Sequence, residues 1–175
     1  MLITRLTKIA MCLVLALFCL LVAFNNISDY NANYEFVQHV LSMDTTFPGN
    51  ELRSRAITNP TLWRLVYALI IIAEGVTGAL FLAGAVQMTR ALRAPGAAFN
   101  RAKAYAIAGG LVAFFVWFFG FMVVAGEWFD MWQSKTWNGQ EAAFRFYMAV
   151  LAVLILLNQS DPDLPPEDAK RRGAP

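Results

Sequence analysis

Glu74 is the residue of this sequence best placed for chemistry, because it is a carboxyl group in the middle of a long apolar stretch. It lies ten residues after Arg64, roughly 15 Å along a helix, which an arginine side chain cannot span. Acids within membranes mark proton and ion pathways in many transporters. Three roles stay open for Glu74: a hydrogen-bonded link between helices, a proton- or ion-handling group, or a ligand contact. Thr77, a backbone carbonyl and Trp117 are its candidate partners.

A second polar group occurs in segment 126–141. The segment contains three tryptophans, Trp128, Trp132 and Trp137. Their spacing is typical of the aromatic belt at the headgroup level of a membrane. Glu127 beside them predicts an ion pair with Arg145 or Arg64, which would hold the outer rim of a bundle together. The alternative is an outward-facing polar site for a ligand or a quinone headgroup.

The other chemically versatile residues are few. His39 is the only histidine, whereas haem usually takes two axial ligands and zinc three or four, so we predict no metal and no cofactor. A structural or interfacial role, a ligand shared across an oligomer and a pH-responsive role stay open for His39. Cys12 and Cys19 lie roughly 10 Å apart on a helix, too far for a disulfide, and we interpret them as small core residues rather than lipid-facing or modified thiols. We find no catalytic constellation and predict no enzymatic activity.

The elements that carry these residues are membrane spans. Apolar residues make up 58% of the chain and charged residues 15%, against about 25% charged residues in soluble domains. The net charge of +2 and the absence of a contiguous basic patch argue against nucleic-acid binding. The apolar runs predict four spans, at about residues 9–24, 62–88, 105–126 and 142–157.

The flanking residues define these spans. No small-residue cleavage pattern follows the first run, and bulky Leu17 and Phe18 precede Cys19, so we expect an uncleaved anchor. Asn59 and Pro60 predict the start of the second helix. Residues 34–43 have the apolar spacing of a short amphipathic helix that lies on the membrane or over the bundle. The predicted fold is an all-α membrane protein, a four-transmembrane-helix bundle with this short helix in the first outer loop. Residues 1–160 form the domain, and residues 161–175 a disordered cytoplasmic tail.

The distribution of Lys and Arg predicts the orientation. With the N-terminus inside, nine basic residues face the cytoplasm: Arg5, Lys8, Arg90, Arg93, Arg101, Lys103, Lys170, Arg171 and Arg172. Five face outward: Arg53, Arg55, Arg64, Lys135 and Arg145. The positive-inside rule therefore favours a bacterial inner-membrane protein with both termini in the cytoplasm.

Several segments together resemble a known family. They are residues 36–46 (FVQHVLSMDTT), residues 55–57 (RAI), the stretch from Tyr67 to Glu74, residues 126–134 (GEWFDMWQS) and residues 137–140 (WNGQ). The chain resembles, over about residues 1–160, a proteobacterial family of predicted small integral membrane proteins labelled domain of unknown function 2165. The resemblance implies four spans and an inner-membrane location, and it implies no activity and no catalytic residues.

Three functional hypotheses remain. The first is a non-enzymatic accessory or structural subunit, working as a homo-oligomer or beside a larger membrane complex, because small residues around Gly75 and Gly78 would let a second helix approach closely. The second is a small transporter or channel that uses Glu74. The third is a quinone- or lipid-binding membrane subunit that uses segment 127–137. Under each hypothesis we expect the protein to be surrounded by membrane lipid as a partner.

Overall fold

The computed structural model describes residues 1–165, and every regular element in that part of the chain is a helix. Four helical stretches are long and apolar enough to cross a membrane: Leu2–Ser28 (α1), Pro60–Arg90 (α3), Gly96–Trp128, and Gln140–Asn158 (α6). The third stretch combines Gly96–Ala102 (α4), Ala104–Phe114 (α5) and Phe115–Trp128 (η2). The predicted all-α bundle with four spans is confirmed.

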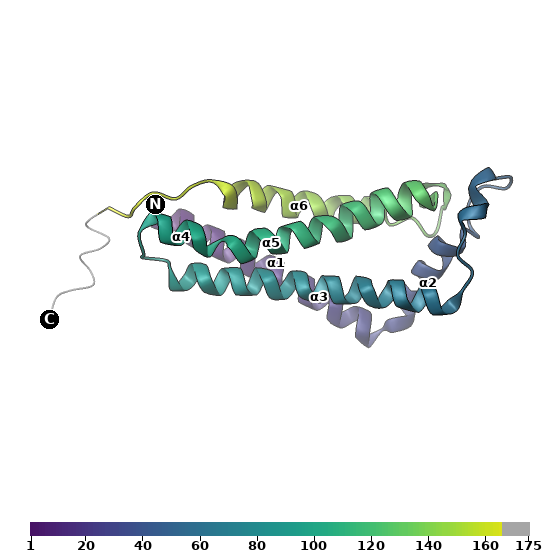
Figure 1. Ribbon diagram of the computed structural model, residues 1–175, viewed down its shortest axis with the longest axis horizontal. Helices are drawn as coiled ribbons and strands as arrows, with labels where there is room; N and C mark the ends of the chain where they lie inside the picture. The colour runs from purple at the N-terminus through teal and green to yellow at the C-terminus, as the bar shows by residue number, and fades with distance from the viewer. Residues whose placement is uncertain (166–175) are drawn as a thin grey trace.

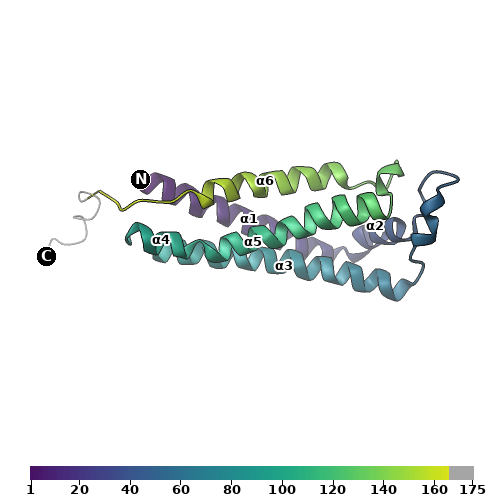
Figure 2. The ribbon, with the colours of Figure 1, turned by 45° about the horizontal axis from the view of Figure 1, so that its top comes forward.

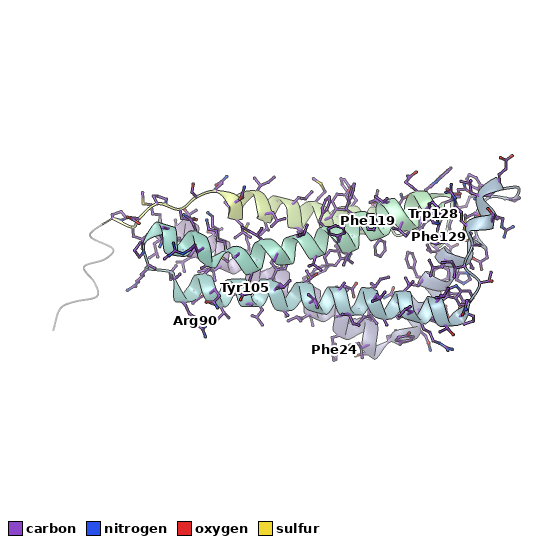
Figure 3. All side chains as sticks on the ribbon, viewed as in Figure 1. Phe24, Arg90, Tyr105, Phe119, Trp128 and Phe129 are labelled. Atoms are coloured by element: carbon purple, nitrogen blue, oxygen red, sulfur yellow. The ribbon has the colours of Figure 1, made fainter. Side chains whose placement is uncertain are left out.

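The four stretches form an antiparallel ring, with the N-terminus and the end of α6 at the same end (Figures 1 and 2). Helix α1 packs against α3 and α6, and the third stretch also packs against these two helices. We call the end that carries Arg5, Lys8, Arg90 and Lys103 the basic end. The opposite end, which carries Trp128, Trp132 and Trp137, is the tryptophan end; Figure 3 labels Arg90 at the first and Trp128 at the second.

Helix α1 is longer than the apolar run that predicts it. It begins at Leu2 and ends at Ser28, so it includes Arg5 and Lys8 before the run and Asn26 after it. Asp29, with φ −118° and ψ 66°, then separates α1 from Tyr30–Ser42 (α2). The chain therefore turns back over the bundle without a long loop, which brings polar residues of α1 and α2 together.

Close helix packing uses the small residues of α3 within this chain. A Cβ at Gly78 would lie 2.7 Å from Leu20 Cγ on α1, and one at Gly84 would lie 2.6 Å from the Cβ of Ala106 on α5. These contacts need glycine because any side chain would push the helices apart. Helix α3 begins as predicted at Pro60, where the side chain of Asn59 accepts a 2.8 Å hydrogen bond from the amide of Thr61.

A cap closes the tryptophan end. Helix α2 is the predicted short amphipathic helix, and it lies over the bundle with Val37, Val40 and Leu41 buried. Met43, with φ 51°, ends this helix. Two short 3-10 helices, Glu51–Arg55 (η1) and Met131–Gln133 (η3), complete the cap. The first, η1, lies in the connection between α2 and α3, and the second, η3, lies in the hairpin between η2 and α6.

The third crossing changes its helical type halfway. Its α5 part is α-helical and packs along α3, whereas η2 is a π-helix over fourteen residues. At the end of η2 the amide of Phe129 donates to the carbonyl of Val124 at 3.1 Å, five residues back. π-helical segments are rare and frequently occur at functional sites. The change begins where the third crossing approaches the cap.

Candidate functional site

Glu74 is buried within the bundle, with 4% of its surface exposed. Its Oε2 atom accepts a 2.7 Å hydrogen bond from the side-chain amide of Asn26 on α1. Thr77, a candidate partner from the sequence, instead donates to the backbone carbonyl of Ala73 at 2.7 Å. Asn26 was missed because the apolar run ends at Phe24, which made the following asparagines resemble a loop.

Asn26 is the centre of a polar chain that joins three helices. Its Oδ1 atom accepts a 2.7 Å hydrogen bond from the side-chain amide of Asn33 on α2. Its backbone carbonyl accepts a 3.1 Å hydrogen bond from the hydroxyl of Tyr67 on α3. Buried polar networks are stable where each member has a partner, and these bonds fix Glu74 relative to α1 and α2.

This polar chain lies on the wall of a cavity of about 380 Å³ near the tryptophan end, which we call the polar cavity. Its polar lining comes from Asn26, Asn33, Glu74, Thr136 and Asn138. Its aromatic lining comes from Phe36, Tyr67, Trp117, Phe121, Trp137 and Phe146. Within residues 1–165 the lining contains one acid and no Lys, Arg or His. A cavity of this volume, with aromatic residues and a few polar groups on its lining, is typical of small-molecule sites.

Trp137 forms part of the cover of the polar cavity. Its ring stacks on His39 of α2, with ring centroids 4.6 Å apart and an angle of 15° between the planes. Nδ1 of His39 lies 2.8 Å from a carboxylate oxygen of Asp44. The hydroxyl of Ser134 accepts bonds of 2.9 Å from the backbone amide of Trp137 and from the hydroxyl of Thr45. His39 therefore lies beside the cavity and contacts it through Trp137 rather than lining it.

The other two tryptophans of the segment are exposed and lie outside the polar cavity. The guanidinium of Arg55 lies 4.5 Å from the ring centroid of Trp128, and Phe47 meets Trp132 edge to face at 5.7 Å. Exposed aromatic rings at one end of the spans fit the predicted interfacial belt.

The predicted rim ion pair of Glu127 differs from the structure. Arg145 pairs with Glu141, one turn earlier on α6, and both side chains are exposed. Among residues 1–165, Glu127 and Arg64 form no ion pair within 4.0 Å. Arg145 pairs with Glu141 rather than with Glu127 because residues four apart on a helix are neighbours. The cap is instead tied by buried Asp130, which accepts a 2.9 Å bond from the side-chain amide of Asn50.

The basic end contains a second buried polar cluster. Lys8 of α1 and Lys103, between α4 and α5, each lie 2.5 Å from Oδ2 of Asp161. Burial alone would raise the pKa of Asp161, but hydrogen bonds from Lys103 and Lys8 outweigh it and hold the pKa below its usual range. Arg5 donates to the backbone carbonyls of Leu92, Ala94 and Pro162.

This cluster binds residues 159–163, which we call the C-terminal strap. Gly96 is the first residue of α4, and its backbone amide donates a 2.6 Å hydrogen bond to Oδ1 of Asp163. The sequence favours a disordered tail from Asp161, but Asp161 is buried and the strap packs on α1 and α4. The rest of that predicted tail from residue 166 lies outside the described residues. The composition of the tail did not predict the strap, because the lysines that bind Asp161, Lys8 and Lys103, are far away in the sequence.

The remaining candidates for redox or metal chemistry are separated. Cys12 and Cys19 are buried in the apolar core and unpaired, as their spacing predicts. In the part of the chain that the structure describes, no three His, Cys, Asp or Glu residues are grouped closely enough to hold a metal ion.

Sequence comparison places the chain in a family. The family model of the predicted small integral membrane protein DUF2165 matches residues 4–160. This range includes the second to fourth spans, the first span except for its first two residues, the polar cavity and most of the basic cluster. The chain matches no curated protein and no solved structure. The four apolar helices agree with the description of the family. The chain belongs to this family of small integral membrane proteins.

Proposed function

We propose that this protein is a non-enzymatic membrane subunit that binds a planar, uncharged ligand with carbonyl or hydroxyl groups in the polar cavity. The head of a quinone is the simplest such ligand. The observation that carries the proposal is the hydrogen-bonded chain Asn33–Asn26–Glu74 on the wall of an otherwise aromatic cavity of about 380 Å³. A buried polar chain that opens on a cavity offers fixed hydrogen-bonding groups to a guest.

The lining supports this ligand chemistry. Phe36, Phe146 and Trp137 line the cavity with aromatic rings against which a planar ligand can pack. Trp117 also lines it but is only 2% exposed and packs against Phe18 and Phe146. Asn138 and Asn33 line the cavity with side-chain amides, and Trp117 lines it as well, so the proposal assigns its indole N–H to the ligand as a donor. An anionic headgroup would meet Glu74 with no cation among the described residues of the lining, which is unfavourable because a buried charge needs a partner. An uncharged head avoids this cost.

Two other hypotheses have less support. Of the small residues that favoured a homo-oligomer, Gly78 and Gly84 are used within the chain because they face α1 and α5, whereas a Cβ at Gly75 would meet nothing within 4 Å. A transport pathway from Glu74 would have to pass the core between it and the basic end, where the described side chains include Cys19, Phe81 and Met88. A role beside a larger membrane complex is compatible with ligand binding and forms part of the proposal.

We also propose that the basic end faces the cytoplasm of a bacterial cell and the tryptophan end faces outward. Arg5, Lys8, Arg90, Arg101 and Lys103 lie near the ends of the spans on the side of the N-terminus, and Arg93 lies in the connection between the second and third spans. The positive-inside rule supports this orientation in an inner membrane. In that orientation the polar cavity lies toward the outer leaflet.

Binding of duroquinone, a benzoquinone with four methyl groups and no long chain, tests the ligand proposal. Native mass spectrometry of the protein in mild detergent would measure its occupancy. We expect Trp117→Phe, which keeps an aromatic ring and removes a donor, to weaken binding roughly three- to ten-fold, the value of one hydrogen bond. Trp132→Phe is the matched control, because Trp132 is exposed outside the cavity. Absence of binding by the wild type, or equal binding by the Trp117 variant, would refute the proposal.

A further inference from the structure

An apolar groove of about 410 Å³ lies between α2, α3 and the π-helix η2. Helix α3 contributes Leu69 and Ile70, η2 contributes Phe115 and Phe119, and α2 contributes Val40. Figure 3 labels two residues that line the groove, Phe119 on the third crossing and Phe129 directly after its end. Each of its lining residues is apolar or glycine, so the groove suits a hydrocarbon chain.

The mouth of the groove faces the surroundings of the bundle. Leu69, Phe115 and Phe119 have exposed fractions of 56%, 55% and 48%. All three lie within membrane-spanning stretches. Their exposed surfaces therefore contact lipid chains in a membrane, and a molecule dissolved in the bilayer can reach the groove sideways without crossing water.

The groove and the polar cavity share a wall. Four residues line both spaces: Phe36, Val37, Ile70 and Phe121. Phe36 of α2 and Phe121 of η2 stack on one another in this wall, with ring centroids 5.8 Å apart and an angle of 21° between the rings. A pair of aromatic side chains thus separates a space for an apolar chain from a space for a polar head.

We propose that the ligand is an amphiphile of the isoprenoid-quinone type, with its ring in the polar cavity and its single apolar chain in the groove. It comes from the bilayer between α3 and η2 and passes the Phe36–Phe121 pair. This inference rests on the proposed function of the polar cavity and adds the position of the chain and the path of access. A phospholipid fits less well, because its phosphate would meet Glu74 with no cation among residues 1–165 on the lining of either space.

Gly120 allows the groove to be filled without a backbone clash. It lines the groove, and an added Cβ would meet only the carbonyl of Phe115 at 3.6 Å, an ordinary van der Waals distance. Gly120→Leu therefore places an alkyl group in the groove. Gly75→Leu is the matched control, since a Cβ at Gly75 meets nothing within 4 Å and Gly75 lines neither space.

The experiment compares duroquinone with its analogue in which a decyl chain replaces one methyl group, using native mass spectrometry of the full chain. Gly120→Leu is expected to weaken binding of the decyl analogue at least roughly ten-fold, because a filled groove cannot also hold the chain. Binding of duroquinone should stay unchanged in this variant. Gly75→Leu should leave both compounds unaffected. A decyl chain that ends in a photoreactive diazirine should label the stretches that line the groove, residues 36–41, 66–73 or 112–129.

The outcomes separate the two proposals. If the wild type binds neither quinone, or Trp117→Phe does not weaken duroquinone, the proposed function fails and the inference fails with it. If duroquinone binds in a Trp117-dependent way but Gly120→Leu affects both compounds equally or neither, only the inference about the chain is overturned. Labelling outside the groove-lining stretches, residues 36–41, 66–73 and 112–129, would overturn it as well.

Discussion

The side-chain amide of Asn26 donates a 2.7 Å hydrogen bond to the carboxyl group of Glu74, although 48 residues separate the two in the chain. The bond crosses the interface between α1 and α3, where Leu20 packs against Gly78. Helix packing and the polar chain therefore depend on one another, because a shift of α1 along α3 would break the bond. The wall of the polar cavity is set by this same interface.

A double-mutant cycle on this pair should reveal coupling. Asn26→Leu leaves the buried carboxyl of Glu74 without its donor, which should lower the free energy of unfolding by about 1–3 kcal/mol. A double-mutant cycle of Asn26→Leu with Glu74→Met should give a coupling of about 0.6 kcal/mol and at most about 1.7 kcal/mol, the average and the maximum measured for polar contacts between membrane helices. Unfolding by titration with dodecyl sulfate in mixed micelles would measure it. Glu74→Gln keeps an acceptor and should cost less; a coupling near zero would contradict the role of this bond.

The basic end should respond to acid through Asp161. Because the pKa of Asp161 is lowered in the folded protein, its ionised form contributes stability that is complete above its unfolded pKa of about 3.9. This contribution is lost as the pH falls from there through the folded pKa. The difference in thermal stability between wild type and Asp161→Asn should stay constant above about pH 4 and shrink below it. A difference that instead grows with acidification would show that the sign is wrong.

The C-terminal strap should be sensitive to one methyl group at Gly96. A Cβ there would collide with the backbone of Asp161 and would lie 2.8 Å from the carbonyl carbon of Pro162. Gly96→Ala should therefore lower the free energy of unfolding by about 1–3 kcal/mol, the usual cost of overpacking. Gly75→Ala, whose Cβ meets nothing, should be neutral or stabilising by up to about 1 kcal/mol through helix propensity. Equal effects would argue against a tightly packed strap.

Thiol labelling can test the orientation in the membrane. Lys135→Cys at the tryptophan end and Arg93→Cys at the basic end replace exposed basic residues in loops. We expect a membrane-impermeant maleimide to label Lys135→Cys in intact bacterial cells and Arg93→Cys only after permeabilisation. The native thiols of Cys12 and Cys19 should give little background because both are fully buried. The reverse pattern would invert the proposed orientation.

The sequence predicts the features of this fold that depend on local pattern. Apolar runs predict the four spans, Asn59 and Pro60 predict the start of α3, and the spacing of Val37, Val40 and Leu41 predicts the helix that covers the bundle. These features follow from the length of the bilayer, from capping and from helical period. Each can be derived from a short stretch of sequence.

The relationships between distant residues could not be predicted in this way. Asn26, Asn33 and Asp161 lie beyond the ends of apolar runs, so composition alone assigns them to loops or tails. Their partners depend on the tilt and rotation of helices, which hydropathy does not encode. The ion pair of Arg145 with Glu141 could have been predicted, because the two residues are four apart on a helix. This pair occupies an arginine that the sequence predicts as a partner of Glu127.

The C-terminal strap has a mechanical consequence for the bundle. It ties the end of α6 to α1 and α4, so these three elements share a fixed point at the basic end. The cap holds the opposite end separately, through the bond from Asn50 to Asp130 and the bond from Asn26 to Glu74. Because each end has its own fixed point, Gly96→Ala should lower hydrogen-exchange protection at the basic end more than at the tryptophan end.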